Sequence, residues 1–281
     1  MYKGFSSSLL GFRGRLLKDD VSLALENAYE GINFNIAEEY LNDSDPGKIK
    51  ELLQKSNLKP GGFGLPVDFR NAEEKYEENF AKLPDYCKYA KEIGMDRCIT
   101  WIFPSHDTLD YKANYKLHKD RLTRVAKTLE EYGIRFGLEF VGPPRERKGK
   151  KYEFIHNLDT LMELLNDIGT SNMGILLDAY HWDMAGQTSD DFKKIPGNKW
   201  VIMAHINDAP LGIPVEEQKD LVRDLPGATG VIRIAEFFKG LGGLDYDGPV
   251  YVEPFSDPLK AMDFPDAVKT AKAAMDKVWP K

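Results

Sequence analysis

Short apolar runs alternate along the whole chain with longer stretches in which apolar and charged residues recur at helical spacing. In residues 119–132, Leu122, Val125, Ala126 and Leu129 share one helical face and charged residues occupy the other. The same pattern predicts helices at residues 76–93, 111–132, 158–168, 231–241 and 266–278. The apolar runs predict strands at residues 3–10, 31–36, 63–67, 97–103, 135–141, 173–180, 200–206 and 249–255.

Eight predicted strands that alternate with helices in 281 residues are typical of an α/β protein with a (β/α)8 barrel. The alternative is a doubly wound open sheet. In such a sheet a glycine-rich phosphate loop would follow the first strand, and none follows this strand, which reads Gly-Phe-Ser-Ser-Ser-Leu-Leu-Gly over residues 4–11. No linker, charge block or repeat marks a boundary, so we expect a single domain over residues 1–281. The longest irregular segments, 141–154 and 208–230, follow the fifth and seventh strands, where barrel loops carry function.

Composition removes several classes of function. With 42% hydrophobic and 11% aromatic residues the chain is not disordered, and its net charge of −7 disfavours binding to nucleic acid. No apolar run is as long as a membrane span, and the N-terminus is more typical of a strand than of a signal peptide. Cys87 and Cys98 have no metal-site spacing and are interpreted as buried free thiols. We therefore expect a cytoplasmic protein without membrane or nucleic-acid partners.

Four residues able to bind a metal end four successive predicted strands: Glu139, Asp178, His205 and Glu253. Each follows an apolar stretch, where a charge is costly to bury unless it is paired or coordinates an ion. In a barrel these strand ends converge at the mouth, and three carboxylates there would repel one another without a cation. The pattern predicts one divalent ion per chain. Oxygen and imidazole ligands suit Mn²⁺ first, with Mg²⁺, Co²⁺ or Zn²⁺ as alternatives.

Other residues near the strand ends are candidates for contact with a small molecule. Trp101 and Trp182 follow or end predicted strands, so they are either part of a sugar-facing wall or core packing. A charge run at residues 145–151 is either a solvated surface or a loop that closes over substrate, with His156 entering the pocket behind it. None of the eight strand ends supplies a lysine, which argues against a Schiff-base aldolase.

Four segments carry a resemblance to a known family: Gly-Leu-Glu139-Phe, Leu-Leu-Asp178-Ala-Tyr-His181, Ala-His205-Ile-Asn-Asp and Tyr-Val-Glu253-Pro. They resemble the xylose isomerase-like TIM barrels, and more closely the sugar phosphate isomerase/epimerase branch, which includes tagatose and psicose 3-epimerases and the inosose enzymes. The resemblance implies that Glu139, Asp178, His205 and Glu253 hold one divalent metal ion. It also implies that His181 contacts the substrate and that the protein is a homodimer or tetramer.

Two departures refine this resemblance. The ketohexose 3-epimerases have a substrate-binding arginine six residues after the metal histidine, where this chain has Leu211. Arg223 is the nearest replacement, in a segment that looks like the R-x-x-P-G element of other branches. The AP endonuclease branch binds three zinc ions and needs further histidines for them, including one after the third strand. This chain has five histidines in all and none in its third strand, so it does not match that branch.

The predicted chemistry is proton transfer next to a carbonyl. A divalent ion would polarise the carbonyl of a keto-sugar or sugar derivative and stabilise an enediolate, while Glu139 and Glu253 remove and return the proton. This makes the chain a metal-dependent sugar isomerase or epimerase. A dehydratase or lyase acting on a keto-sugar, keto-inositol or keto-glycoside would use the same site, because it begins with the same proton abstraction. A non-catalytic sugar-binding barrel is the alternative from a different class.

Overall fold

Parallel strands form one curled sheet in the computed structural model, which describes residues 1–42 and 44–281. Its strand order is β3-β2-β1-β11-β10-β9-β7-β5-β4. The strands are β1 (Tyr2–Phe5), β2 (Gly31–Ile32), β3 (Lys59–Pro60), β4 (Phe63–Gly64), β5 (Arg97–Ile102), β7 (Arg135–Phe140), β9 (Met173–Asp178), β10 (Val201–Ile206) and β11 (Pro249–Val252). Two further strands, β6 (Ser105–His106) and β8 (Tyr152–Glu153), pair with each other antiparallel.

The sheet closes on itself where the chain passes from β3 to β4. These two strands stand at opposite ends of the strand order, yet only Gly61 and Gly62 separate them in the sequence. The Gly61 N–H donates to the Ile32 carbonyl at 2.8 Å, and the Leu65 N–H donates to the Ile99 carbonyl at 2.8 Å. One segment therefore pairs with β2 on one side and with β5 on the other. The predicted (β/α)8 barrel is confirmed, with its third strand interrupted by the two glycines.

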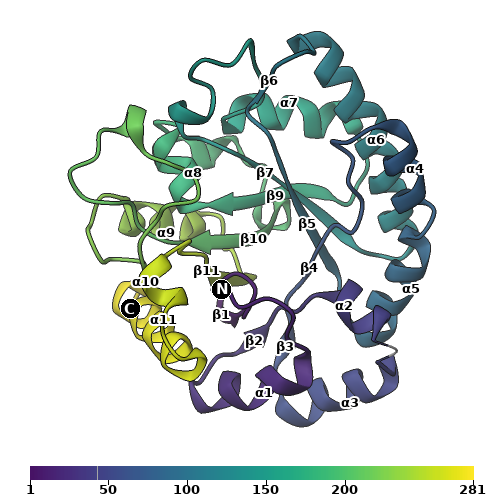
Figure 1. Ribbon diagram of the computed structural model, residues 1–281, viewed down its shortest axis with the longest axis vertical. Helices are drawn as coiled ribbons and strands as arrows, with labels where there is room; N and C mark the ends of the chain where they lie inside the picture. Colours follow the sequence, from purple (N-terminus) through teal and green to yellow (C-terminus); the bar gives the residue numbers. More distant parts are fainter. Residues whose placement is uncertain (43) are drawn as a thin grey trace.

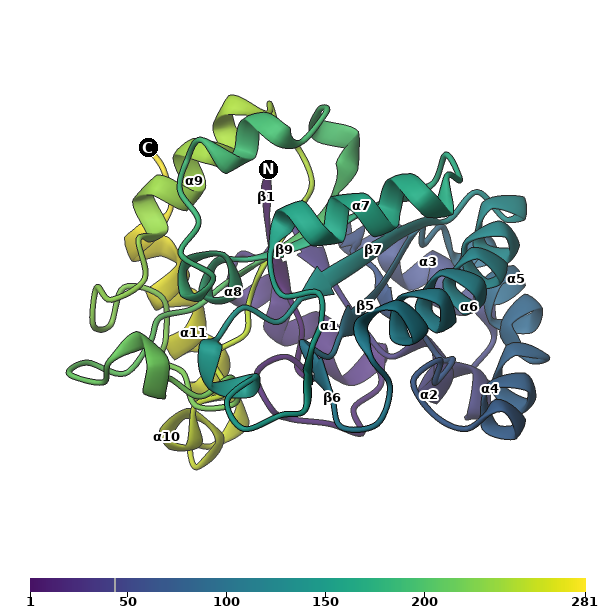
Figure 2. The same ribbon diagram turned by 90° about the horizontal axis from the view of Figure 1, so that it is seen from above.

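Helices form a ring outside the strands (Figure 1). Figure 2 shows α5, α6 and α7 lying side by side along the outside of β5 and β7, and these neighbouring helices contact one another. The helices are α1 (Leu17–Glu26), α2 (Ile36–Leu41), α3 (Pro46–Ser56), α4 (Glu73–Phe80), α5 (Leu83–Ile93), α6 (Tyr111–Glu131), α7 (Leu158–Ile168), α8 (Ala179–Met184), α9 (Ile234–Gly243), α10 (Asp257–Lys260) and α11 (Phe264–Val278). Most begin at a polar cap, such as Asn157, whose side chain accepts the Thr160 N–H at 3.0 Å.

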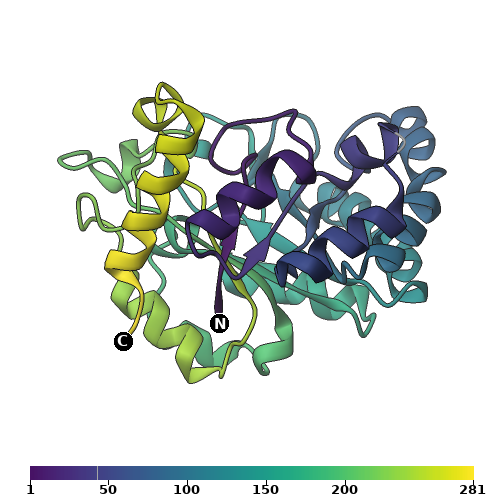
Figure 3. The ribbon, with the colours of Figure 1, turned by 90° about the horizontal axis from the view of Figure 1, so that it is seen from below.

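The C-terminal helix packs beside the N-terminal strand and helix. Figure 3 shows α11 next to α1 and the first strand. Lys3 of β1 forms an ion pair with Asp276 of α11 at 2.6 Å, and the Phe5 and Phe264 rings are 6.4 Å apart. These contacts bring the last element of the chain to the first and complete the ring of helices.

Several predicted elements have other bounds in the structure, such as the strand predicted at residues 3–10, which is β1 (Tyr2–Phe5), and two of the differences have a clear physical cause. The single helix predicted at residues 76–93 is two helices, α4 and α5, because Pro84 lies in the first turn of α5 and cannot continue a helix from the N-terminal side. The strand predicted at residues 173–180 ends at Asp178, whose carboxylate caps α8. This second difference matters for the site, because it turns the residues after Asp178 onto a helix.

Large side chains fill the barrel interior beneath its mouth: Ile99, Leu176, Ile202, Met203 and Tyr251 form one buried cluster. The Tyr251 ring stands edge-on to the His205 ring, with centroids 6.3 Å apart. The side chains at the carboxyl ends of the strands therefore rest on a packed layer and not on a water-filled channel.

Replacing Gly61 by alanine is expected to destabilise the fold by about 1–3 kcal/mol, because the added methyl group overpacks the barrel interior. A Cβ atom at Gly61 would lie 1.7 Å from the Tyr251 hydroxyl oxygen. Urea unfolding of the two proteins measures the difference. Gly64→Ala is the matched control, since a Cβ at Gly64 meets no atom within 4 Å. Equal losses in both variants would contradict the role given to Tyr251.

Candidate metal centre and active-site cavity

The four predicted ligands come together at the mouth of the barrel. One ligand atom each from Glu139, Asp178, His205 and Glu253 lies within 4.8 Å of the others. They belong to β7, β9 and β10 and to the end of β11, which are consecutive in the sheet. His205 is in register with Asp178 on one side and with Tyr251 on the other. Parallel pairing thus brings to one level residues that are far apart in the sequence.

Unpartnered atoms in the cluster fit a bound cation. Glu139 and His205 are buried, and Glu139 Oε1 and both His205 ring nitrogens have no hydrogen-bond partner among the described residues. Buried polar atoms are rarely left unsatisfied, because each costs about 1–3 kcal/mol. A divalent ion bound to these oxygen and nitrogen atoms would satisfy them.

Asp178 has a structural role as well as a place in the cluster. Its Oδ1 atom accepts the Tyr180 N–H at 2.7 Å and the His181 N–H at 3.2 Å, which caps α8. Its Oδ2 atom accepts from Asn207 Nδ2 at 3.0 Å. The Asn207 amide also donates to the Glu253 carbonyl at 3.3 Å, so it links two strand ends of the cluster. Asn207 was not predicted, although it lies two residues after His205 in the same motif.

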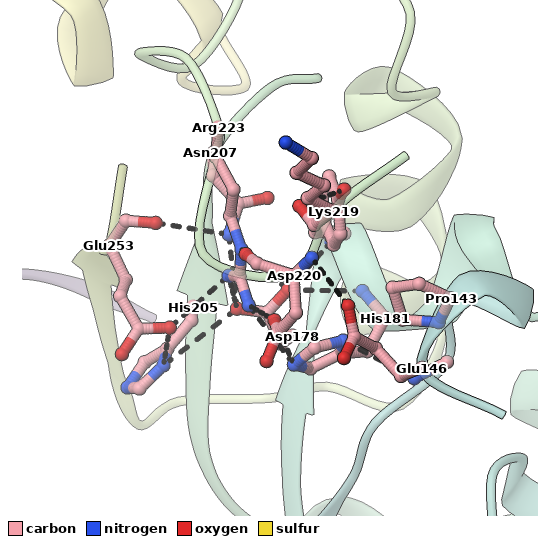
Figure 4. A network of polar contacts seen from close by, with 12 residues as sticks. Pro143, Glu146, Asp178, His181, His205, Asn207, Lys219, Asp220, Arg223 and Glu253 are labelled. Atoms are coloured by element: carbon pink, nitrogen blue, oxygen red, sulfur yellow. Dashed lines mark hydrogen bonds and ion pairs between the residues drawn. The ribbon is translucent and has the colours of Figure 1, made fainter. Parts of the chain in front are cut away.

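Arg223 reaches into the cluster from the long loop between β10 and α9 (Figure 4). Its Nη1 atom donates to Asp178 Oδ2 at 2.9 Å and to Glu253 Oε2 at 3.2 Å, and its Nη2 atom donates to Asp220 Oδ1 at 2.6 Å. The guanidinium lies 4.6 Å from the centre of the Tyr180 ring. Only 3% of the residue is exposed. The carboxylates around this buried charge raise its pKa despite the cost of burial.

Asp208 fastens the loop that carries Arg223. Its carboxylate accepts the backbone N–H groups of Ala209, Thr229, Gly230 and Ile232 at 2.7 to 2.9 Å. Its own backbone exchanges two hydrogen bonds of 2.8 Å with Asp224, the residue after Arg223. Asp208 therefore fixes the place of the guanidinium without contacting it, a role that the sequence motif did not reveal.

His181 presents its Nε2 atom to the site. The Gly142 N–H donates to His181 Nδ1 at 3.3 Å, and Arg223 Nη2 lies 3.0 Å from His181 Nε2, so an N–H group faces each nitrogen of the neutral ring. Burial lowers the pKa of His181 and favours this neutral form. Asp220 Oδ1 lies 3.5 Å from Nε2. Since a guanidinium can only donate, the shorter of the two contacts makes Nε2 an acceptor of the Arg223 N–H, and both side chains line the cavity.

A cavity of about 980 Å³ opens above the cluster. Glu139, Glu253, His181 and Arg223 line one side of it, and Trp101 lines another. Trp101 is 38% exposed, and its ring lies 4.0 Å from the Arg70 guanidinium and edge-on to Phe103 at 4.4 Å. The interpretation of Trp101 as a wall residue agrees with this position.

Two loops meet over the cavity. The short helix η1 (Pro144–Glu146) follows β7, and η4 (Val215–Glu217) follows β10. Arg145 and Lys148 bind the Glu217 carboxylate at 2.9 and 2.6 Å, and Lys150 binds Asp107 at 2.9 Å. The charge run at residues 145–151 thus connects loops, and Arg145 and Lys150 also line the cavity.

The chain was then compared with known proteins. The family model of the xylose isomerase-like TIM barrel matches residues 21–278. The chain belongs to this family. The resemblance and the (β/α)8 fold predicted from the sequence are thereby confirmed.

Relatives of this TIM-barrel chain carry the names of enzymes. An inosose isomerase of Bacillus velezensis is 24% identical over 272 residues, covering 94% of this chain and 92% of the relative. A ketose 3-epimerase of Arthrobacter globiformis is 29% identical over 148 residues, covering 52% of this chain and 43% of the relative. The prediction of an enzyme with sugar isomerase and epimerase relatives is confirmed.

Solved structures share the whole fold. A xylose isomerase domain protein from Alicyclobacillus acidocaldarius superposes with a TM-score of 0.86 at 25% identity, covering 99% of this chain and 98% of that one. The IOLI protein, crystallised with a zinc atom, superposes with a TM-score of 0.83 at 23% identity over 99% and 98% of the two chains. No helix of this TIM-barrel chain within residues 1–42 and 44–281 is long and apolar enough to cross a membrane.

The structure corrects the interpretation of two predicted substrate contacts. Trp182 is 1% exposed and packs against Phe192 and Phe237 with ring centroids 5.8 Å away, so it is a core residue. Trp182 is buried because α8 begins directly after Asp178. The first turn of α8 directs the Trp182 side chain away from the barrel mouth, into the layer between the strands and the outer helices. His156 does not line the cavity. Its Nδ1 atom lies 2.7 Å from the Phe154 carbonyl oxygen, in the segment between β8 and α7.

Binding of a divalent cation is expected to release protons from Glu139. Burial, together with the charges of Glu253 and Asp178, raises the pKa of Glu139 well above its ordinary value. A coordinating carboxylate must be deprotonated, so the number of protons released should increase as the pH is lowered through the raised pKa of Glu139. Calorimetric titration of Mn²⁺ in buffers of different ionisation enthalpy measures this number. Release that does not depend on pH would contradict the raised pKa.

Proposed function

We propose that the protein is a divalent-metal-dependent isomerase or epimerase of a keto-sugar or a related polyhydroxy ketone. The observation that carries the proposal is the convergence of Glu139, Asp178, His205 and Glu253 within 4.8 Å at the edge of a 980 Å³ cavity. A divalent ion, with Mn²⁺ as the first choice, would supply Lewis-acid polarisation of a carbonyl oxygen. The sugar isomerase and epimerase names of the relatives support this class of substrate.

The side chains around the cluster divide the remaining work. Glu139 and Glu253 line the cavity, and each carboxylate has a second oxygen that can accept a proton while the first binds an ion. One would remove the proton next to the carbonyl and the other would return it. His181 would contact the oxygen at the reacting carbon through its Nε2 atom, which lies beside Arg223 at the cavity wall. Arg223, which lines the cavity, would hold the carboxylates of Asp178, Glu253 and Asp220 in place.

Metal analysis and solvent exchange test the proposal together. We expect about one divalent ion per wild-type chain after dialysis against Mn²⁺ and much less in Asp178→Asn, a variant that can still cap α8 through its amide oxygen. The loaded protein is then incubated with keto-sugars in deuterated water. Deuterium at the carbon beside the carbonyl supports proton abstraction. A chain that takes up no ion overturns the proposal and favours a sugar-binding barrel.

The product decides between two outcomes of the same first step. Return of the proton gives an isomer or epimer of the starting sugar, whereas loss of a neighbouring oxygen substituent gives an unsaturated ketone, as in a dehydratase or lyase. Mass analysis of the product separates the two. The dimeric or tetrameric state implied by the family resemblance stays a prediction, and light scattering of the purified protein tests it.

A further inference from the structure

A second group of polar side chains lines the same cavity but comes from other elements than the carboxylate cluster. It belongs to α6, which follows β5, whereas the cluster comes from β7, β9, β10 and β11. Figure 1 shows α6 in the ring of helices at the upper right, outside the strands, and β11 left of the centre. Asn114 and His118 of α6 both line the cavity, and they are only 2% and 4% exposed. The proposed proton transfer uses neither residue.

Hydrogen bonding fixes the form of the His118 ring. Its Nδ1 atom lies 2.9 Å from the Asn114 carbonyl oxygen, which can only accept, so Nδ1 carries the hydrogen. The Nε2 atom of the neutral ring is therefore an acceptor. Burial lowers the pKa of His118 to about 4, which keeps the ring neutral at physiological pH. The Phe69 and Phe154 rings, with centroids 5.4 and 4.8 Å from the imidazole, hold its orientation.

The atoms that complete this group lack partners. His118 Nε2, Asn114 Oδ1 and Arg70 Nε are buried and have no hydrogen-bond partner among the described residues. Arg70 lines the cavity, and its guanidinium stacks on Trp101 at 4.0 Å and on Phe69 at 4.2 Å. Three unsatisfied polar atoms in one wall of a cavity are costly unless a ligand or an ordered water bonds to them.

We propose that Asn114, His118 and Arg70 form a second binding subsite that takes a hydroxyl group at the end of the substrate remote from the reacting carbonyl. The hydroxyl donates its hydrogen to His118 Nε2 and accepts from the Asn114 amide or from Arg70. This assignment rests on the proposed function and narrows it: Nε2 of the neutral His118 ring needs a group that donates a hydrogen, and an alcohol does so whereas a phosphate dianion does not, although the Arg70 charge would attract a phosphate. The Trp101 ring provides the apolar surface between the two subsites.

Two replacements of His118 separate the two ring nitrogens. His118→Asn keeps a donor near Nδ1 for the Asn114 carbonyl but has no atom at the position of Nε2. His118→Gln extends an amide oxygen to about the position of Nε2 and keeps the acceptor. Binding is measured by calorimetry with D-psicose, D-tagatose and D-fructose and with their counterparts that lack the hydroxyl at C5 or C6.

We expect wild type to bind at least one ketohexose about tenfold more tightly than His118→Asn does, with most of the loss restored in His118→Gln. One deoxy counterpart should bind wild type and His118→Asn equally, because it lacks the hydroxyl that Nε2 accepts. Equal binding of every ketohexose by wild type and His118→Asn overturns the subsite, and so does the absence of binding to wild type.

A measurement on the unaltered chain does not depend on the folding of a variant. In protein labelled with ¹⁵N-histidine, the His118 Nε2 resonance should shift on ketohexose binding and stay unchanged with the deoxy counterpart. A resonance that does not move contradicts the subsite. Deuterium exchange at the carbonyl end is scored separately. Binding through His118 without proton exchange would support the subsite and overturn the proposed function. Proton exchange at an unchanged rate in His118→Asn would overturn the subsite and support the proposed function.

Discussion

Replacing Glu139 by glutamine is expected to lower the rate of solvent-proton exchange into a keto-sugar by a factor of about 10²–10⁴, the contribution typical of a positioned general base. The amide has nearly the shape of the carboxylate and can still offer an oxygen to the ion, but it cannot take up a proton. Glu139 is 7% exposed and lines the cavity, and its Oε1 atom has no partner among the described residues. With one of its oxygens on the ion, the carboxylate has a second oxygen at the cavity wall for the substrate.

Metal content has to be measured on the same preparation, because Glu139 is also a predicted ligand. Glu153→Gln is the matched control, since Glu153 is exposed on β8 and does not line the cavity. A Glu139→Gln protein that retains its ion and exchanges protons at the wild-type rate would contradict the assignment. A protein that loses the ion would show that Glu139 is essential to the metal centre, and exchange would then be measured with excess Mn²⁺.

The residues of the candidate metal centre could be predicted from the sequence because strand ends are visible in it. Glu139, Asp178, His205 and Glu253 each end an apolar run, and the parallel strands of a barrel place such ends at one rim. Alternation of short apolar runs with helical patterns also determined the fold class. Neither inference needs the contacts between distant loops.

Residues in loops and on short helices could not be placed in the same way. Trp182 was interpreted as a wall residue because the predicted strand continued to residue 180. In the structure α8 begins after its cap Asp178, and Trp182 is buried in the core. The contacts of Arg223 with Asp178 and Glu253 join positions 45 and 30 residues apart and depend on the path of the β10–α9 loop. His118 lies on the buried face of α6, where the periodicity predicts packing and says nothing of a cavity.

Replacing Arg223 by methionine is expected to destabilise the cation-free protein by about 3–5 kcal/mol, the usual result of removing one partner from a buried ion pair. The variant keeps a long apolar side chain between Tyr180 and Phe255, which flank the guanidinium at 4.6 and 4.8 Å. It leaves Asp178 and Glu253 without the charge that bonds to both. Saturating Mn²⁺ should restore most of the loss, because the ion supplies positive charge to the same carboxylates. Urea unfolding with and without Mn²⁺ measures both effects.

The stability that Arg223→Met loses should depend on pH. Although burial alone would raise the pKa of Asp178, the Arg223 charge and the neighbouring histidines lower it to about 2 from its ordinary value of 3.8. A carboxyl group with a lowered pKa stabilises the folded state above its ordinary pKa, and this contribution disappears as the pH falls toward 2. The difference between wild type and Arg223→Met should therefore shrink between about pH 4 and pH 2.

Arg135→Met is the control for this prediction, because Arg135 binds Asp96 at 3.5 Å with the two side chains 30% and 51% exposed, and a pair of that kind contributes about 1 kcal/mol or less. Equal unfolding midpoints of wild type and Arg223→Met without a cation would show that Arg223 does not compensate the carboxylates. A difference that persists in full when Mn²⁺ is bound would assign the effect to packing against Tyr180 and Phe255 instead of charge. Recovery by Mn²⁺ in Arg223→Met alone is the result that identifies the guanidinium as the counterion of the cation-free centre.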